Sequence, residues 1–210
     1  MIIDSKCKKC RRAGEKLFLK GERCNTPKCA MVRKPYPPGE KSKRRRGGIS
    51  EYGKELREKQ KLKNWYNLTE KQFYNYVKSA MAKRGEEVDA GEVLLRKMES
   101  RLDNTVYRFG FASSRRQARQ MISHGLFLIN GRKVNIPSYL LKEGDIIKID
   151  PQKKDKKIFQ GLSEKLKNHQ TPSWLFLDLK KMEGKVGGQP LVEEITPPVQ
   201  ISSIFEYYSR

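Results

Sequence analysis

The segment 100–150 constrains the fold of this chain more than any other part of it. An arginine-rich stretch begins after Ser113, which we expect to cap a helix, and ends at Gly125, where a helix-terminating glycine belongs. Apolar residues then run into Asn130-Gly131, the strongest short signal for a β-hairpin. The segment therefore predicts a basic helix beside a small antiparallel sheet, and such a surface suits a phosphate backbone.

The charge of the chain calls for an anionic partner. Its 210 residues include 46 Lys and Arg but only 24 Asp and Glu, which gives a formal net charge of +22. Such an excess keeps a protein soluble but makes it repel itself. The net charge is +14 over residues 1–64, +9 over 65–170 and −1 over 171–210. The first three quarters of the chain should therefore bind the partner, whether nucleic acid, an anionic membrane or an acidic protein.

Neither a membrane span nor a secretory leader is expected. The sequence has no apolar run of about 18 residues, the length that a membrane helix needs. Its N-terminus lacks the apolar core of a signal peptide. We therefore expect a cytoplasmic protein with no membrane partner.

Three helical regions are marked ahead of the arginine-rich stretch. Ser50 is a good N-cap for a helix over 51–65. Thr69 and Gln72 have the spacing of a capping box, and the apolar residues that follow repeat at helical intervals. A third region repeats at three- and four-residue steps through 92–110.

The later part of the chain has the two-residue period of strands. We expect strands at 126–129, 132–134, 145–150 and 174–179. Residues 181–198 have the composition of a loop. The apolar and aromatic end, 201–208, is expected to dock onto an earlier domain rather than fray.

Four cysteines form two short-spaced pairs near the N-terminus. Cys7 and Cys10 are separated by two residues, and Cys24 and Cys29 by four. Two such knuckles joined by a loop are typical of a closed, structural zinc site with four thiolates. The surrounding Pro- and Lys-rich segment is too poor in apolar residues for a core, so metal would supply its folding free energy. Four unligated thiols and an iron–sulfur cluster are the alternatives.

The arginines of the basic helix are the strongest candidate ligands for RNA. Arg115, Arg116 and Arg119 should share its outer face, and Arg101 and Arg108 one helix earlier could join them. A planar guanidinium matches phosphate geometry. The alternative is a solvated charged face, but residues 113–125 contain no acidic partners at helical spacing. No nucleotide-binding loop, dinucleotide fingerprint or spaced acidic pair is present, so neither catalysis nor a small-molecule substrate is expected.

The sequence resembles a known family over nearly its full length. SRLDNTVYRFGFASSRRQARQMISHGLFLINGRKVNIPSYLLKEGD is similar to a small RNA-binding domain that several translation proteins share. CKKCRRAGEKLFLKGERCNTPKCAMVRKPYPPGEK, SEYGKELREKQKLKNWYNLTEKQFYNYV and the ending IFEYYSR narrow the resemblance. Together they are similar to the family of bacterial small-subunit ribosomal protein four in its zinc-carrying form.

The resemblance implies an α+β fold. It would have a zinc-knuckle N-terminal segment and a helical domain, with an inserted small RNA-binding domain of two helices on an antiparallel sheet. The expected divisions are a zinc-binding and basic extended segment at 1–48, a helical domain at 49–91 completed by 185–210, and the inserted domain at 92–184.

The resemblance also implies the function. The chain would be a structural, non-catalytic part of the ribosome that binds the 5′ domain of small-subunit ribosomal RNA and nucleates assembly. It would line the channel through which messenger RNA enters, and affect translational accuracy through ribosomal protein five of the small subunit. The expected RNA-binding residues are Lys43, Arg44, Arg45, Arg46, Arg57, Lys61, Arg101, Arg108, Arg115, Arg116, Arg119 and Lys133.

Two other classes of function fit parts of the sequence. An RNA-modifying enzyme could carry the same binding domain, but the sixty residues after Asp150 are too few for a catalytic domain. A redox or metal-sensing regulator could use the thiolates, and it would lose metal and change RNA affinity on oxidation.

Overall fold

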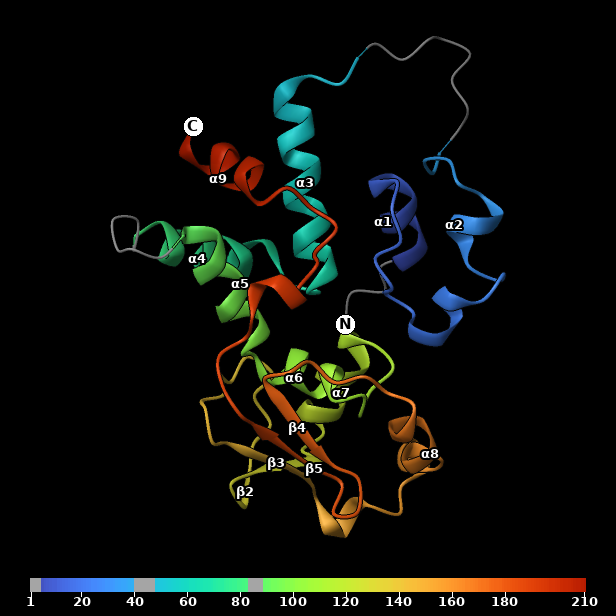
Figure 1. Cartoon of the computed structure of the whole chain (residues 1–210). Coiled ribbons are helices and arrows are strands. Elements are labelled where there is room, and N and C mark those ends of the chain that lie inside the picture. The colour runs from blue at the N-terminus through green and yellow to red at the C-terminus, as the bar shows by residue number, and fades with distance from the viewer. Residues whose placement is uncertain (1–4, 40–47, 83–88) are drawn as a thin grey trace. The chain divides into compact units, whose positions relative to one another are not determined.

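The computed structural model describes residues 5–39, 48–82 and 89–210. The chain divides into two compact units (Figure 1). Unit 1 comprises Met1–Gly91 together with Pro197–Arg210, and unit 2 is the intervening Glu92–Thr196. Unit 2 is therefore an insertion in unit 1. None of the described helices is both long enough and apolar enough to cross a membrane.

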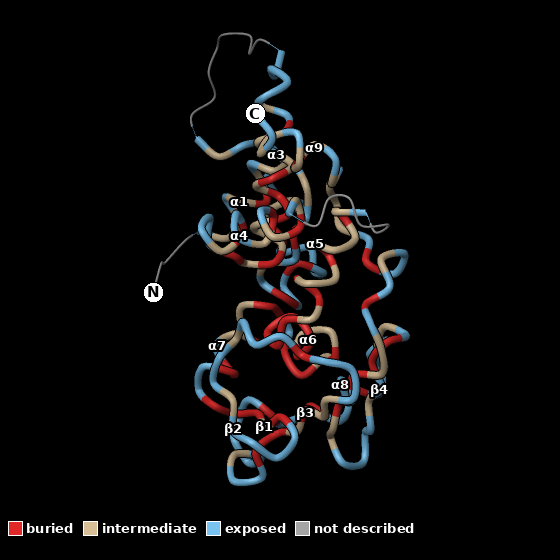
Figure 2. Tube along the Cα trace, turned by 90° about the vertical axis from the view of Figure 1, so that its left-hand side faces the viewer, coloured by how far each residue is buried: buried red, intermediate tan, exposed pale blue. Residues whose placement is uncertain are grey.

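Unit 1 is helical. Its elements are α1 (Lys6–Ala13), the 3-10 turn η1 (Gly21–Asn25), α2 (Ala30–Arg33), α3 (Glu51–Trp65), α4 (Glu70–Met81) and α9 (Ile201–Ser209). The face of α4 that carries Phe73 and Val77 is fully buried, as are Leu62 of α3 and Ile204 of α9. These apolar side chains form the core of unit 1, and the buried stretches of α3 and α4 are visible in Figure 2.

The expected helix starts in unit 1 are confirmed. Ser50 Oγ accepts a hydrogen bond from the backbone N–H of Gly53 at 3.2 Å, which caps α3. Thr69 and Gln72 form the reciprocal capping box of α4. Each cap satisfies backbone N–H groups that the first turn of a helix leaves without partners.

The end of the chain docks as expected. Helix α9 packs against α3, as Figure 1 shows, although the whole of unit 2 separates them in sequence. The backbone N–H of Gln200 donates to Glu58 Oε2 at 3.1 Å at the start of α9. The Tyr208 hydroxyl donates to Glu70 Oε1 at 3.1 Å near its end. Polar contacts thus fix α9 at both ends.

Unit 2 places helices on one antiparallel sheet. Helix α5 (Ala90–Glu99) leads into it, and the further helical elements are α6 (Leu102–Arg108), α7 (Arg115–Ser123), η2 (Pro151–Lys153), η3 (Lys157–Phe159), α8 (Leu162–Lys167) and η4 (Val192–Glu194). The strands are β1 (Phe127–Ile129), β2 (Arg132–Lys133), β3 (Ile146–Ile149), β4 (Leu175–Asp178) and β5 (Glu183–Val186), in the order β2-β1-β3-β5-β4. The hairpin at Asn130-Gly131 is confirmed, and both residues have positive φ.

One face of the sheet and the inner sides of the helices form the core of unit 2. Phe127 and Ile147 on the sheet are fully buried, as are Phe109 after α6 and Ile122 on α7. Figure 2 shows buried residues gathered in α6, β1 and β3. Gly184 lies directly against the Phe109 ring, where an added Cβ would come within 2.5 Å of Cζ. The absence of a side chain at this position lets the ring reach the sheet.

The structure departs from the expected helices at two points. The N-cap of α7 is Ser114 rather than Ser113, and its Oγ accepts from the backbone N–H of Gln117 at 3.3 Å. The region 92–110 is two helices rather than one, because Arg101 has extended backbone angles and pairs with Leu140. The helical period continues across this break, so the sequence does not mark it.

The inserted unit also extends further than the expected 92–184. Residues expected to be loop form β5, which pairs with both β3 and β4. The backbone N–H of Ser173 donates to Glu194 Oε2 at 3.0 Å and ties the segment after β5 to the same unit. The return to unit 1 therefore begins at Pro197 instead of 185.

Candidate nucleic-acid interface

Helix α7 presents the arginines of the candidate interface. Its inner side is apolar, because Ala118, Met121 and Ile122 are buried in the core of unit 2. Arg115 and Arg116 begin the helix and Arg119 follows one turn later. The packing of the inner side fixes the rotation of α7, and with it the positions of these three arginines.

A buried carboxylate at the end of α5 holds two of the surrounding arginines. Arg108 donates to Glu99 through Nε and Nη2, both at 2.9 Å, as a two-pronged fork. Arg115 Nη2 lies 3.9 Å from the same carboxylate. Asn104 Nδ2 donates to Glu99 Oε2 at 2.5 Å. The Glu99 side chain is fully buried, so these donors replace the water that a carboxylate otherwise needs.

Asp103 makes a second set of ion pairs. Arg101 donates to it through Nε at 3.0 Å and Nη2 at 2.8 Å. Arg119 Nη2 lies 3.2 Å from Asp103 Oδ2. We define the arginine cluster as Arg101, Arg108, Arg115 and Arg119 together with Glu99 and Asp103. Four guanidinium groups and two carboxylates give the cluster a net charge of +2.

The cluster corrects the expectation that Arg115 points outward. Arg115 is buried, its Nε donates to Asn104 Oδ1 at 2.7 Å, and its guanidinium lies 4.7 Å from the centre of the Tyr107 ring. Arg101 is only 1% exposed. Glu99 of α5 reaches Arg115 through tertiary packing, so no acidic residue at helical spacing within α7 predicts this contact. Asp103 is only two residues from Arg101, so that pair is local and lies at the start of α6.

The remaining arginines keep access to solvent. The side chains of Arg108 and Arg119 are 19% and 27% exposed even though both are paired. Arg116 is half-buried and makes no ion pair with any residue in the described parts of the chain. Of the five candidate arginines in unit 2, Arg108, Arg116 and Arg119 are therefore the ones that solvent can reach.

Lys133 lies beside Lys153, which is not among the residues that the sequence predicts to bind RNA. Lys133 is exposed, and its side chain passes over Gly125 at the end of α7. Lys153 Nζ donates to Gly125 O at 2.7 Å. Desolvation and the neighbouring ammonium of Lys133 both lower the pKa of Lys153. Residues 153–157 contain four lysines, but no local pattern predicts that this run returns to the end of α7.

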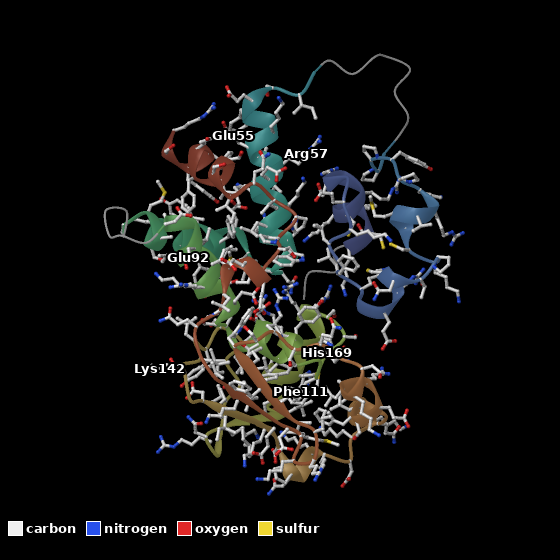
Figure 3. The ribbon with its side chains drawn as sticks, in the orientation of Figure 1. Glu55, Arg57, Glu92, Phe111, Lys142 and His169 are labelled. Atoms are coloured by element: carbon white, nitrogen blue, oxygen red, sulfur yellow. The ribbon has the colours of Figure 1, made fainter. Side chains whose placement is uncertain are left out.

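The candidate RNA-binding residues of unit 1 also include one exposed and one buried side chain. Arg57 is exposed, and Figure 3 shows it on the side of α3 opposite Glu55. Lys61 is buried and donates to Glu15 Oε1 and Glu58 Oε1, both at 2.8 Å. Burial alone would lower the pKa of Lys61, but these two hydrogen bonds outweigh it and raise the pKa. Lys43, Arg44, Arg45 and Arg46 lie outside the described residues.

The four cysteines belong to one short segment of unit 1. Cys7 and Cys10 lie on α1, Cys24 in η1, and Cys29 is the N-cap of α2. All except Cys7 are buried. Burial raises the pKa of Cys10, a backbone hydrogen bond from Leu17 opposes it, and the other three thiols raise it further. No three Cys, His, Asp or Glu side chains among the described residues are gathered as a metal site requires.

The donor set nevertheless suits a thiophilic metal. The backbone N–H of Lys20 donates to Cys24 Sγ at 3.3 Å, and that of Leu17 to the Cys10 sulfur. Hydrogen bonds to sulfur favour the thiolate, which is the form that binds zinc. Four cysteine sulfurs are also the ligand set of closed structural zinc sites.

Comparison with known proteins gives one consistent result. A family model described as "Ribosomal protein S4/S9 N-terminal domain" matches residues 2–99, and one described as "S4 domain" matches residues 100–147. The small ribosomal subunit protein uS4 of Caldicellulosiruptor bescii is 49% identical over 208 residues, which cover 99% of this chain and 98% of the relative. Its counterpart in Halothermothrix orenii is 50% identical over 97% of this chain and 96% of the relative. That of Thermotoga maritima is 46% identical, with the same two coverages.

Proposed function

The chain belongs to the family of small ribosomal subunit protein uS4, and from that premise we propose that it binds the 5′ domain of small-subunit ribosomal RNA and nucleates assembly. It is a structural component of the small ribosomal subunit rather than an enzyme. The observation that supports the RNA-binding role is the arginine cluster with Arg116, which gathers guanidinium groups beside a solvent-accessible helix.

Phosphate contacts supply most of the affinity in this proposal. Arg108, Arg116 and Arg119 meet one stretch of RNA backbone, and Lys133 with Lys153 meets another. Each phosphate that a cation neutralises releases counterions, so affinity falls as salt rises. Sequence enters only indirectly, because the RNA junction is selected by its shape.

Salt-dependent filter binding tests this role. The wild-type protein is titrated against 5′-domain RNA with an unrelated structured RNA as competitor, and tight, competitor-resistant binding is expected. Arg116→Glu should weaken binding and reduce the slope of log K against log salt by about one, as expected for one lost phosphate contact. Lys167→Glu makes the same change of charge at an exposed position of α8 and serves as the control. Equal losses from both variants would mean that only net charge is sensed.

The cysteines are proposed to hold one structural Zn²⁺. Cys7, Cys10, Cys24 and Cys29 would be its ligands, and zinc would supply the cross-link that residues 5–39 otherwise lack. The ligand type and the backbone N–H bonds to two of the sulfurs support this proposal.

A role at the channel through which messenger RNA enters is proposed for the basic run Lys43–Arg46. Contact with ribosomal protein five of the small subunit, and through it an effect on translational accuracy, belong to the same proposal. Its support is the family and the charge of this segment. Replacing the four residues with alanine should change the misreading rate of ribosomes reconstituted with the variant while leaving binding to the 5′ domain largely intact. An unchanged misreading rate would contradict the proposal.

A further inference from the structure

The arginine cluster contains two carboxylates on a surface proposed to bind a polyanion. Glu99 and Asp103 are both buried and both accept forked hydrogen bonds from arginine. Their negative charge alone should weaken RNA binding, because a negative charge near phosphate repels it. Their geometry indicates instead that they favour RNA binding.

Each carboxylate lies against one half-buried arginine that keeps some access to solvent and one arginine that is buried. Glu99 holds Arg108 by a fork and lies near the buried Arg115. Asp103 holds the buried Arg101 by a fork and pairs with Arg119. The two half-buried guanidinium groups, Arg108 and Arg119, therefore each lie against a buried carboxylate.

A second layer fixes the carboxylates. The Asn104 side chain supports the Glu99 set, since its Nδ2 donates to Glu99 and its Oδ1 accepts from Arg115 Nε at 2.7 Å. Asp103 and Asn104 are neighbours on α6, and the backbone N–H of Asp103 donates to Pro137 O at 3.1 Å. The positions of Arg108 and Arg119 thus depend on α5, α6 and α7 together.

We propose that Glu99 and Asp103 are positioning residues for RNA phosphate. They hold Arg108 and Arg119 in their binding orientations before RNA arrives, so that RNA does not have to order two long side chains. Orientation fixed in advance lowers the cost of binding, and a planar guanidinium matches the geometry of phosphate. This inference rests on the proposed RNA-binding function and adds the residues that preorganise its surface.

The test uses substitutions for which the positioning role predicts weaker RNA binding, whereas the change in net charge predicts equal or tighter binding. Glu99→Gln and Asp103→Asn each remove one negative charge, so charge alone predicts equal or tighter binding to 5′-domain RNA. Positioning predicts binding about tenfold weaker, with a shallower salt slope, because one charge-assisted hydrogen-bonded pair is lost. Affinity is measured on the RNA-competent fraction, determined by stoichiometric titration.

Two matched variants separate positioning from other effects. Glu164→Gln removes an exposed carboxylate on α8 of the same unit and should bind RNA as tightly as wild type or slightly more tightly. Leu166→Ala creates a cavity at a buried position of α8 and should lower stability without changing the salt slope. If Glu99→Gln does not fold, Asp103→Asn decides the question through the other carboxylate.

Nuclear magnetic resonance on the RNA-free protein gives an independent readout. The Arg108 Nε–H signal should be sharp and protected from exchange in the wild type and averaged in Glu99→Gln. If the wild-type protein binds target and competitor RNA equally weakly, the proposed function itself is overturned. If the wild-type protein binds target RNA tightly, and Glu99→Gln and Asp103→Asn bind it as tightly or more tightly, only the positioning role is overturned.

Discussion

Arg210 donates through Nη2 to Glu55 Oε1 at 2.7 Å, which joins the end of α9 to the first half of α3. The Glu55 side chain is only 5% exposed. Its other oxygen, Oε2, is buried and accepts no hydrogen bond from any residue that the structure describes. The packing of α3 and α9 removes the Glu55 carboxylate from water, and the hydrogen bond from Arg210 offsets part of the cost of burying this charge.

Arg210→Ala should destabilise unit 1 by about 1–2 kcal/mol, since it leaves a buried charge without its partner. The estimate is below that for a fully buried pair because the Arg210 side chain is half exposed. Urea unfolding followed by Trp65 fluorescence, in a Trp174→Phe background, reports on unit 1. Glu206→Ala on the exposed side of α9 is the control and should change stability by less than about 0.5 kcal/mol. Equal stability of the two variants would show that the pair is not important.

The stability of unit 1 should fall as the solution is acidified below about pH 4.5. Burial raises the pKa of Glu70, but hydrogen bonds from Lys59 and Lys63 outweigh it and lower the pKa to about 2. A carboxylate with a depressed folded-state pKa contributes stability above its unfolded pKa, and that stability is lost as pH falls toward the folded value. Because Glu70 is half exposed, the loss between pH 5 and 2 should be roughly 1 kcal/mol. Glu70→Gln should be less stable at pH 7 and have a smaller pH dependence, and a slope equal to that of wild type would assign the effect to other groups.

Gly184→Ala should destabilise unit 2 by about 1–3 kcal/mol, the usual range for overpacking. The added methyl group would meet the Phe109 ring, which is fully buried and cannot move aside freely. Gly188→Ala is the control, since nothing lies within 4 Å of its added carbon. Thermal unfolding of both variants checks this, and a tolerated alanine at 184 would mean that the ring has room to shift.

The purified protein should contain about one zinc per chain by mass spectrometry of its metals. Cys24→Ser should lose the metal, and chelation should unfold residues 5–39 while hydrogen exchange in unit 2 stays unchanged. Iron with visible absorbance would instead favour an iron–sulfur cluster, and metal-free protein with protected amides in α1 would remove the need for a metal. Metal that leaves on mild oxidation, with a change in RNA affinity, would favour the regulatory role.

Local signals predicted much of the fold. The caps at Ser50 and Thr69 and the hairpin at Asn130-Gly131 depend on neighbouring residues, and all three are confirmed. Strand β5 was missed, because Glu183–Val186 has two polar residues and a glycine in four positions. That glycine is required by Phe109, which is far away in sequence. A strand selected by such a contact has no local pattern.

The solvent access of the arginines on α7 was predicted only in part. Of the three arginines that their spacing places on the outer face, Arg116 and Arg119 keep solvent access, whereas Arg115 does not. Arg115 is buried beside Glu99, a carboxylate on another helix, whereas Arg101 is buried beside Asp103, two residues away on α6. Sequence periodicity gives the side of a helix on which a residue lies. Periodicity does not show which side chains of another helix pack against that side, and this packing decides which arginines reach solvent.

Because unit 2 is inserted within unit 1, the two parts of unit 1 are synthesised at different times. When α3 and α4 leave the translating ribosome, the helix that covers part of α3 has not yet been made, because 197–210 follows all of unit 2. Unit 2 holds its sheet and helices in one continuous stretch and can fold while unit 1 waits. A nascent chain interrupted after Thr196 would then carry a finished RNA-binding unit attached to an open helical one. Unit 1 can therefore be completed only after residues 197–210 have been translated.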